Sequence, residues 1–291
     1  MKKVTRVHTN NQRHWVGDGF PVRTMFSYAD LARELSPFLL LDYAGPYQFP
    51  PSDKRRGVGE HPHRGFETVT IVYDGEVEHR DSTGAGGVIG AGDVQWMTAA
   101  SGLVHEEFHS REFSARGGAF ECIQLWVNLA AKDKGVPPGY QGITAAQIPQ
   151  VEIAEAAGSV RVIAGSYRGA QGPARTFSPM QVWDARLKKG ARVSFELNDG
   201  DTAALFVMNG QLKFGGGESA GEATLVAFER AGSELVFDVI EDTKVLLLSG
   251  APFDEAIVGY GPFVMNSEAE IRTAIEDYRS GKMGHISVAA G

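Results

Sequence analysis

Short segments rich in β-branched and aromatic residues recur along most of the chain, separated by turns rich in glycine. The clearest apolar runs cover residues 66–73, 94–98 and 120–129. Asp74-Gly75 ends the first run with a strong hairpin signal, and residues 76–81 then alternate between polar and apolar side chains. This pattern is typical of half-buried and buried strands. It predicts an all-β fold.

The second half of the chain repeats the first at an offset of 135 residues, which aligns Glu67 with Thr202 and Asp74-Gly75 with Asn209-Gly210. Residues 131–142 contain Pro137-Pro138-Gly139 and resemble a linker. We therefore expect an N-terminal domain at 1–135 and a C-terminal domain at 136–291.

The clearest helix prediction lies near the C-terminal end, and residues 28–35 could form a short helical turn before Pro37. Ser267 and Glu270 have the spacing of a capping box, and Gly281 is a suitable stop. Between them Ile271, Ala274, Ile275 and Tyr278 follow the i, i+3, i+4, i+7 spacing of one apolar stripe. We expect this stripe to pack on the core.

Composition excludes several classes of protein. The net charge of −8 argues against a nonspecific nucleic-acid surface. The one cysteine, Cys122, cannot form an intrachain disulfide and suits a reducing compartment. No secretory signal follows Met1, and no run of 18 apolar residues indicates a membrane span. We expect a cytoplasmic protein without membrane or direct nucleic-acid contacts.

Five of the eight histidines lie between residues 61 and 109, and they suggest metal chemistry. His61 and His63 flank a proline, so this segment should be an edge or the entry to a strand. Residues i and i+2 of a strand share a face, so both imidazoles can turn towards one ion, as can His105 and Glu107. A single such pair is more often structural than metal-binding, whereas two pairs in one barrel indicate a metal site.

The residues alone leave the carboxylate ligand open. Glu107 should share the face of His105, and Glu106 should point the other way. Glu67 lies four residues beyond His63, so strand parity allows it to point inwards as well. Three imidazoles and one carboxylate suit a divalent first-row metal with positions left for water or substrate.

These residues resemble the motifs of a known family. His61-x-His63-x-x-x-Glu67 with Gly75 is similar to the first cupin motif, and Gly92 with Gly102-x-x-His105 is similar to the second. The longer phrases resemble the pirin family of bicupins from near residue 15 to near residue 282. They cover residues 17–23, 61–69, 92–99, 124–129 and 260–266.

The resemblance implies two tandem cupin barrels, which are double-stranded β-helices of jelly-roll type, followed by a C-terminal helix. It assigns His61, His63, His105 and Glu107 as the ligands of one metal ion and leaves Glu67 outside the ligand set. One departure is Ala100, which stands where cupins usually carry a proline before the glycine. In the repeat Glu196 and Asn198 replace the first two histidines, so we expect the C-terminal barrel to lack a metal.

The family also implies an activity. Bacterial pirins resemble quercetin 2,3-dioxygenases, which would make the substrates dioxygen and a flavonol such as quercetin, opened at a 3-His-1-Glu iron(II) site. Manganese, nickel, copper, cobalt or zinc also fit the ligand set. Glu107 could act as a transient catalytic base or be purely a structural ligand.

The alternative function is regulatory. Pirins also resemble redox-sensing iron proteins that act as partners of transcription factors or metabolic enzymes. The acidic chain suits such a protein partner better than direct contact with DNA.

Overall fold

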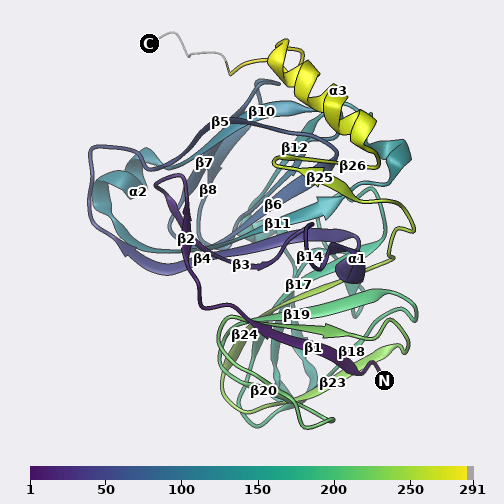
Figure 1. Ribbon diagram of the computed structural model, residues 1–291. Coiled ribbons are helices and arrows are strands. Elements are labelled where there is room, and N and C mark those ends of the chain that lie inside the picture. The colour runs from purple at the N-terminus through teal and green to yellow at the C-terminus, as the bar shows by residue number, and fades with distance from the viewer. Residues whose placement is uncertain (287–291) are drawn as a thin grey trace. The chain divides into compact units, whose positions relative to one another are not determined.

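The computed structural model describes residues 1–286, and it shows two barrel units of the same design (Figure 1). Each unit consists of a seven-stranded sheet, a four-stranded sheet and one additional strand pair. Paired strands are antiparallel, as expected for a cupin-like barrel built from hairpins. The predicted all-β class with one C-terminal helix is confirmed.

The first unit contains all the predicted metal ligands. Its seven-stranded sheet has the spatial order β12 (Gly139–Ile143), β9 (Val94–Thr98), β6 (Phe66–Asp74), β11 (Gly118–Asn128), β4 (Phe38–Phe49), β3 (Phe20–Phe26) and β2 (His14–Val16). Its four-stranded sheet has the order β5 (Gly57–His63), β10 (Leu103–His109), β7 (Val77–Asp81) and β8 (Gly86–Ile89). The strand pair is β25 (Val258–Tyr260) with β26 (Phe263–Met265).

The second unit has the matching sheets. The seven-stranded sheet has the order β1 (Val4–Thr9), β22 (Thr224–Phe228), β19 (Thr202–Asn209), β24 (Thr243–Gly250), β17 (Met180–Leu187), β14 (Gly158–Ala164) and β13 (Gln150–Ile153). The four-stranded sheet has the order β18 (Arg192–Glu196), β23 (Glu234–Val239), β20 (Leu212–Phe214) and β21 (Ser219–Ala220), and β15 (Ser166–Tyr167) pairs with β16 (Ala170–Gln171). The predicted repeat is confirmed where β6 and β19 occupy equivalent places.

Helices are short except at the C-terminal end. They are α1 (Ala32–Leu35), α2 (Arg111–Arg116) and α3 (Glu268–Arg279), with single 3₁₀ turns at Ala131–Asp133, Ala145–Gln147 and Ala154–Ala156. The predicted cap of α3 is confirmed, because the Ser267 side chain accepts a hydrogen bond from the Glu270 backbone N–H. Ile271 and Ala274 are buried as expected, whereas Tyr278 is 40% exposed and does not continue the buried stripe. No helix among residues 1–286 is both long and apolar enough to cross a membrane.

The units depart from the expected division into 1–135 and 136–291 at both ends. The first unit comprises Gln12–Arg33, Phe38–Ala145 and the described residues from Asp254 onwards. The second comprises Met1–Asn11, Glu34–Pro37 and Ala146–Phe253.

Two contacts between segments that are distant in the sequence cause the difference. Strand β1 joins the second unit by pairing with β22, and the C-terminal helix belongs to the first unit rather than to the second. The expected linker also contains β12, which pairs with β9 at the edge of the first barrel. Pairings between distant segments leave no local pattern in a sequence, so the linear reading could not find them.

A buried lysine fastens the C-terminal segment within the first unit. The Nζ atom of Lys134 donates to the carbonyl oxygens of Gly65 and Val264 at 2.6 and 2.9 Å and to Oδ1 of Asn128 at 2.7 Å. Lys134 is 3% exposed, and burial lowers its pKa to about 8. The three acceptors compensate a buried ammonium group and join β26 to the barrel.

We expect Lys134→Met to lower the free energy of unfolding by about 2–4 kcal/mol, because three buried acceptors lose their donor. Urea unfolding followed by tryptophan fluorescence measures this change. Lys132→Met is the matched control, since Lys132 is exposed two residues away. Equal stability of the two variants would contradict an anchoring role for Lys134.

Candidate metal centre

Two paired strands bring the three predicted histidine ligands together. Strand β5 is the edge of the four-stranded sheet, as the proline at position 62 led us to expect, and it pairs with β10. The register places His105 opposite His61. The ring centroids of the three histidines are 4.9 Å (His61–His63), 4.2 Å (His61–His105) and 4.8 Å (His63–His105) apart. One nitrogen from each ring lies within 4.8 Å of the other two, which is close enough to share one ion.

Burial keeps two of these imidazoles neutral. His63 is 4% exposed and His105 is fully buried. Burial lowers the pKa of both groups well below the usual value, and the neighbouring His61 lowers both further. A metal ligand must be the unprotonated imidazole, so the site holds His63 and His105 in the form that binds metal.

A chain of hydrogen bonds fixes which nitrogen of His105 faces the cluster. Asp81 Oδ2 can only accept, so His79 donates to it from Nε2 at 3.1 Å, which leaves His79 Nδ1 as an acceptor. His105 Nδ1 lies 3.2 Å from His79 Nδ1 and must therefore be the donor. The amide of Gln95 also donates to His79 Nδ1, at 3.4 Å, in agreement with this assignment.

The other ring nitrogen of His105, Nε2, is thus unprotonated and carries a lone pair that no hydrogen bond uses. His105 Nε2 is buried and accepts no hydrogen bond among residues 1–286. The same argument applies to His61. Its Nδ1 lies 2.8 Å from the Gly59 carbonyl oxygen and donates to it, which leaves Nε2 for an ion. Unprotonated nitrogens that converge without donors are expected of metal ligands. These residues therefore fit a bound cation.

Asp81 remains an acceptor throughout. Burial alone would raise its pKa, but hydrogen bonds from His79 and Thr83 outweigh burial and hold the pKa below its usual value. Asp81 Oδ1 also accepts from the backbone N–H of Thr83 at 2.8 Å and of Ala85 at 3.2 Å. The turn after β7 thus holds Asp81 in place, at the far end of the hydrogen-bond chain that runs through His79 to His105.

Glu107 lies beside this cluster and is held by amides. Its Oε1 accepts from Gln95 at 2.9 Å, and its Oε2 accepts from Gln124 at 3.3 Å. The Thr70 hydroxyl lies 3.4 Å from Oε1 of Glu107 and donates to Oε1 of Gln124 at 2.6 Å. A carboxylate oxygen of Glu107 lies within 4.8 Å of ligand atoms of His79 and His105, but Glu107 is not grouped as closely with His61 and His63. The register shifts between His105 and Glu107, where β5 carries an extra residue, and such a bulge re-aims neighbouring side chains.

The other two candidate glutamates lie elsewhere. Glu106 faces away from the cluster, as predicted, and accepts from Arg80 Nε at 2.9 Å. Glu67 is fully buried and accepts from Thr98 at 2.7 Å. Burial raises the pKa of Glu67 to about 7. Neither glutamate belongs to a potential metal-binding group among residues 1–286.

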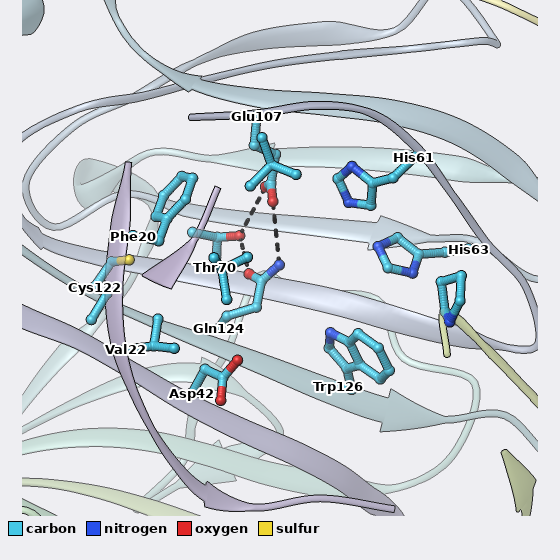
Figure 2. Close-up of a pocket in the computed structure, with 14 residues that line it drawn as sticks. Phe20, Val22, Asp42, His61, His63, Thr70, Glu107, Cys122, Gln124 and Trp126 are labelled. Atoms are coloured by element: carbon cyan, nitrogen blue, oxygen red, sulfur yellow. Dashed lines mark hydrogen bonds between the residues drawn. The ribbon is translucent and has the colours of Figure 1, made fainter. Parts of the chain in front are cut away.

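One cavity of about 340 Å³ adjoins the cluster (Figure 2). His61, His63 and Glu107 line it together with the amide of Gln124. Its other walls are mainly apolar and come from Val16, Phe20, Val22, Ala44, Val58, Cys122, Trp126 and Pro262. A small organic molecule with an aromatic body could therefore bind next to the histidines.

His79 and Asp81 are site residues that the sequence reading missed. The alternation of β7 places both on one face, and the register puts His79 opposite Glu107 and Asp81 opposite His105. Alternation could have suggested that they point inwards. Their contact with His105 could not be read without knowing that β7 pairs with β10.

The equivalent interior of the second unit is filled with apolar side chains. On β18, Val193 and Phe195 are buried, and Glu196 is exposed. Phe195 packs against the rings of Tyr167, Trp183 and Phe237. The absence of metal from this barrel remains a prediction.

Comparisons with known proteins agree with this architecture. The chain matches the family profile described as Pirin over residues 19–127 and that described as Pirin C-terminal cupin domain over residues 182–284. A Pseudomonas aeruginosa protein provisionally named quercetin 2,3-dioxygenase is 57% identical, covering 97% of this chain and 98% of its own. Pirin of Mus musculus is 34% identical, covering 97% of this chain and 94% of its own.

A solved structure is similar along nearly the whole chain. The crystal structure of a quercetin 2,3-dioxygenase from Acinetobacter baumannii superposes with a TM-score of 0.96 at 52% identity. The alignment covers 99% of this chain and all of that chain. Together with the family matches, this structure shows that both units are cupin barrels.

We predict one metal ion per chain, held by the first unit. His63→Ala should reduce the metal content to near zero, because it removes one of three converging lone pairs. Glu196→Ala, which changes the aligned position of the second unit, should still bind one ion. Elemental analysis after anaerobic loading and desalting measures both. Two ions per wild-type chain would contradict a single site.

Glu107→Gln should weaken metal binding about 10–100-fold, because the amide brings no negative charge to the ion. Competition with a chelator of known affinity measures the loss. Glu67→Gln makes the same chemical change away from the histidines and should keep the wild-type affinity. The opposite ranking of these two variants would identify Glu67 as the ligand and refute the assignment of Glu107.

Proposed function

The chain belongs to the pirin family, and on that premise we propose that it is a metal-dependent dioxygenase that opens flavonols such as quercetin. One observation carries the proposal: three imidazoles converge on one point, and two of them, with the nearby Glu107 carboxylate, line a largely apolar cavity. The name of the Acinetobacter baumannii structure, which matches at 52% identity, supports the same reaction.

We assign His61, His63, His105 and Glu107 as the ligands of one divalent ion, and we propose iron(II). Donor chemistry alone would favour copper over iron, so the choice of iron rests on the family. Manganese, nickel, cobalt and zinc would also be accepted by three imidazoles and a carboxylate.

A bound metal would lower the pKa of the flavonol 3-hydroxyl and so favour the enolate that reacts with dioxygen. The protein supplies the surroundings of that step. Phe20 and Trp126 offer apolar surface to the aromatic rings and keep water away from the reacting carbon. His61 and His63 line the same cavity, so a metal held there would be accessible to the oxygens of a bound flavonol.

Glu107 is the group placed to accept the proton of the 3-hydroxyl. Its Oε1 accepts a hydrogen bond from Gln95 and its Oε2 accepts one from Gln124, so each oxygen keeps a lone pair for an ion or a proton. We propose that Glu107 is both ligand and transient base.

We propose the cytoplasm as the location of the protein. Cys122 is 2% exposed, and burial followed by the nearby Glu107 raises its thiol pKa well above the usual value. This thiol, which lies in the cavity wall, is therefore unreactive. A chain whose one cysteine is a free thiol suits a reducing compartment.

We expect iron-loaded protein to consume dioxygen in the presence of quercetin, with loss of the flavonol absorbance and release of carbon monoxide. A flavone that lacks the 3-hydroxyl should not react, because it has no proton to lose at that position. An oxygen electrode and absorbance spectra measure both substrates. If fully loaded protein consumes no dioxygen with any flavonol, the enzymatic proposal fails and the regulatory function becomes the better account.

A further inference from the structure

One row of polar side chains crosses the apolar inner face of the seven-stranded sheet in the first unit. Its members lie side by side on adjacent strands because they are register partners. They are Gln95 on β9, Thr70 on β6, Gln124 on β11, Asp42 on β4 and Thr24 on β3. Register partners on antiparallel strands share one face of the sheet. The row therefore runs as one band across five strands.

The next row on the same face is apolar. Val72, Cys122, Ala44 and Val22 are partners in the same way, and all are buried. The apolar row shows that this face of the sheet can pack without polar side chains. A polar side chain on the same face loses hydration when the barrel folds. The polar row calls for a reason other than packing.

Three of the five members are explained by the proposed metal site. Gln95 and Gln124 donate to the carboxylate of Glu107, and Thr70 donates to Oε1 of Gln124 at 2.6 Å. Asp42 lies one strand beyond Gln124, and Figure 2 shows its carboxyl on the side of Gln124 away from Glu107. Among the described residues, no hydrogen bond joins this end of the row to Glu107.

Asp42 is only half satisfied by the protein. Thr24 donates to Asp42 Oδ1 at 2.5 Å, whereas Oδ2 accepts no hydrogen bond from any residue that the structure describes. Asp42 nevertheless lines the same cavity as His61, His63 and Glu107. An acceptor oxygen thus lies at the cavity wall, with its position set by Thr24.

We propose that Asp42, oriented by Thr24, forms a subsite that accepts a hydrogen bond from a hydroxyl carried on an aromatic ring of the substrate. The inference rests on the proposed function and refines its substrate class. A flavonol that binds the cluster through its 3-hydroxyl and 4-carbonyl would direct its 2-phenyl ring into the apolar part of the cavity. Hydroxyls on that ring are then the donors that can reach Asp42.

A neutral hydroxyl suits this subsite better than a cation. Burial raises the pKa of Asp42, and the hydrogen bond from Thr24 and the nearby His14 oppose the shift only in part. A phenol can bond to a carboxyl in either protonation state, whereas an ammonium ion needs the carboxylate. The apolar walls would also leave most of a cation without hydration.

The test compares quercetin with galangin, a flavonol whose 2-phenyl ring carries no hydroxyl. Dissociation constants are measured without dioxygen on metal-loaded protein, by quenching of tryptophan fluorescence. We expect the wild type to bind quercetin about tenfold or more tightly than galangin, as for a hydrogen bond to a charged acceptor. Equal affinities would overturn the subsite without any need for a variant.

Variants then assign the preference to Asp42. In Asp42→Leu the ratio of the two affinities should fall to near one, and in Asp42→Asn it should fall less, because the amide keeps an acceptor. Asp53→Asn, on the exposed loop before β5, is the control and should keep the wild-type ratio. A preference for quercetin that survives in both Asp42 variants would overturn the assignment. Unchanged metal content in each variant shows that the site is intact.

Dioxygen uptake separates the subsite from the reaction itself. Protein that prefers quercetin through Asp42 but consumes no dioxygen would support the subsite and refute the proposed enzyme. Protein that consumes dioxygen with both flavonols and binds them equally would support the proposed enzyme and refute the subsite. Binding of neither flavonol would overturn the subsite directly.

Discussion

The crowding of three imidazole rings, two of them buried, is the constraint on which the first barrel depends. Their centroids lie 4.2–4.9 Å apart, so protonating His63 or His105 would place a cation against two other rings in a medium that hydrates it poorly. Burial and this crowding lower the pKa of both buried rings. A bound cation resolves this arrangement, because it turns converging acceptors into ligands.

Much of the surrounding structure maintains that arrangement. The contacts from Asp81 through His79 fix the tautomer of His105, and the amides of Gln95 and Gln124 hold Glu107 beside it. Such outer contacts orient ligands and tune their basicity. The second unit, which has matching sheets, packs the corresponding interior with aliphatic and aromatic side chains.

The sequence predicted the parts of the site that follow from local pattern. Alternation along one strand placed His105 and Glu107 on one face and Glu106 on the other, and the family resemblance identified the fold. The sequence could not predict the role of His79, because that role depends on a pairing between β7 and β10 that no local signal encodes. The polar row through Asp42 is also invisible in the sequence, since its members are brought together only by the register of five strands. The exchange of terminal segments between units has the same origin.

The most direct test of the central claim is a crystal structure of the iron-loaded protein, with anomalous scattering recorded at the iron edge. The account predicts one peak per chain, in the first unit, at about 2.0–2.2 Å from one nitrogen each of His61, His63 and His105 and from an oxygen of Glu107. The His105 ligand atom should be Nε2, with Nδ1 still bonded to His79. A peak bound by His79 in place of His61 or His63, or a peak in the second unit, would contradict the account.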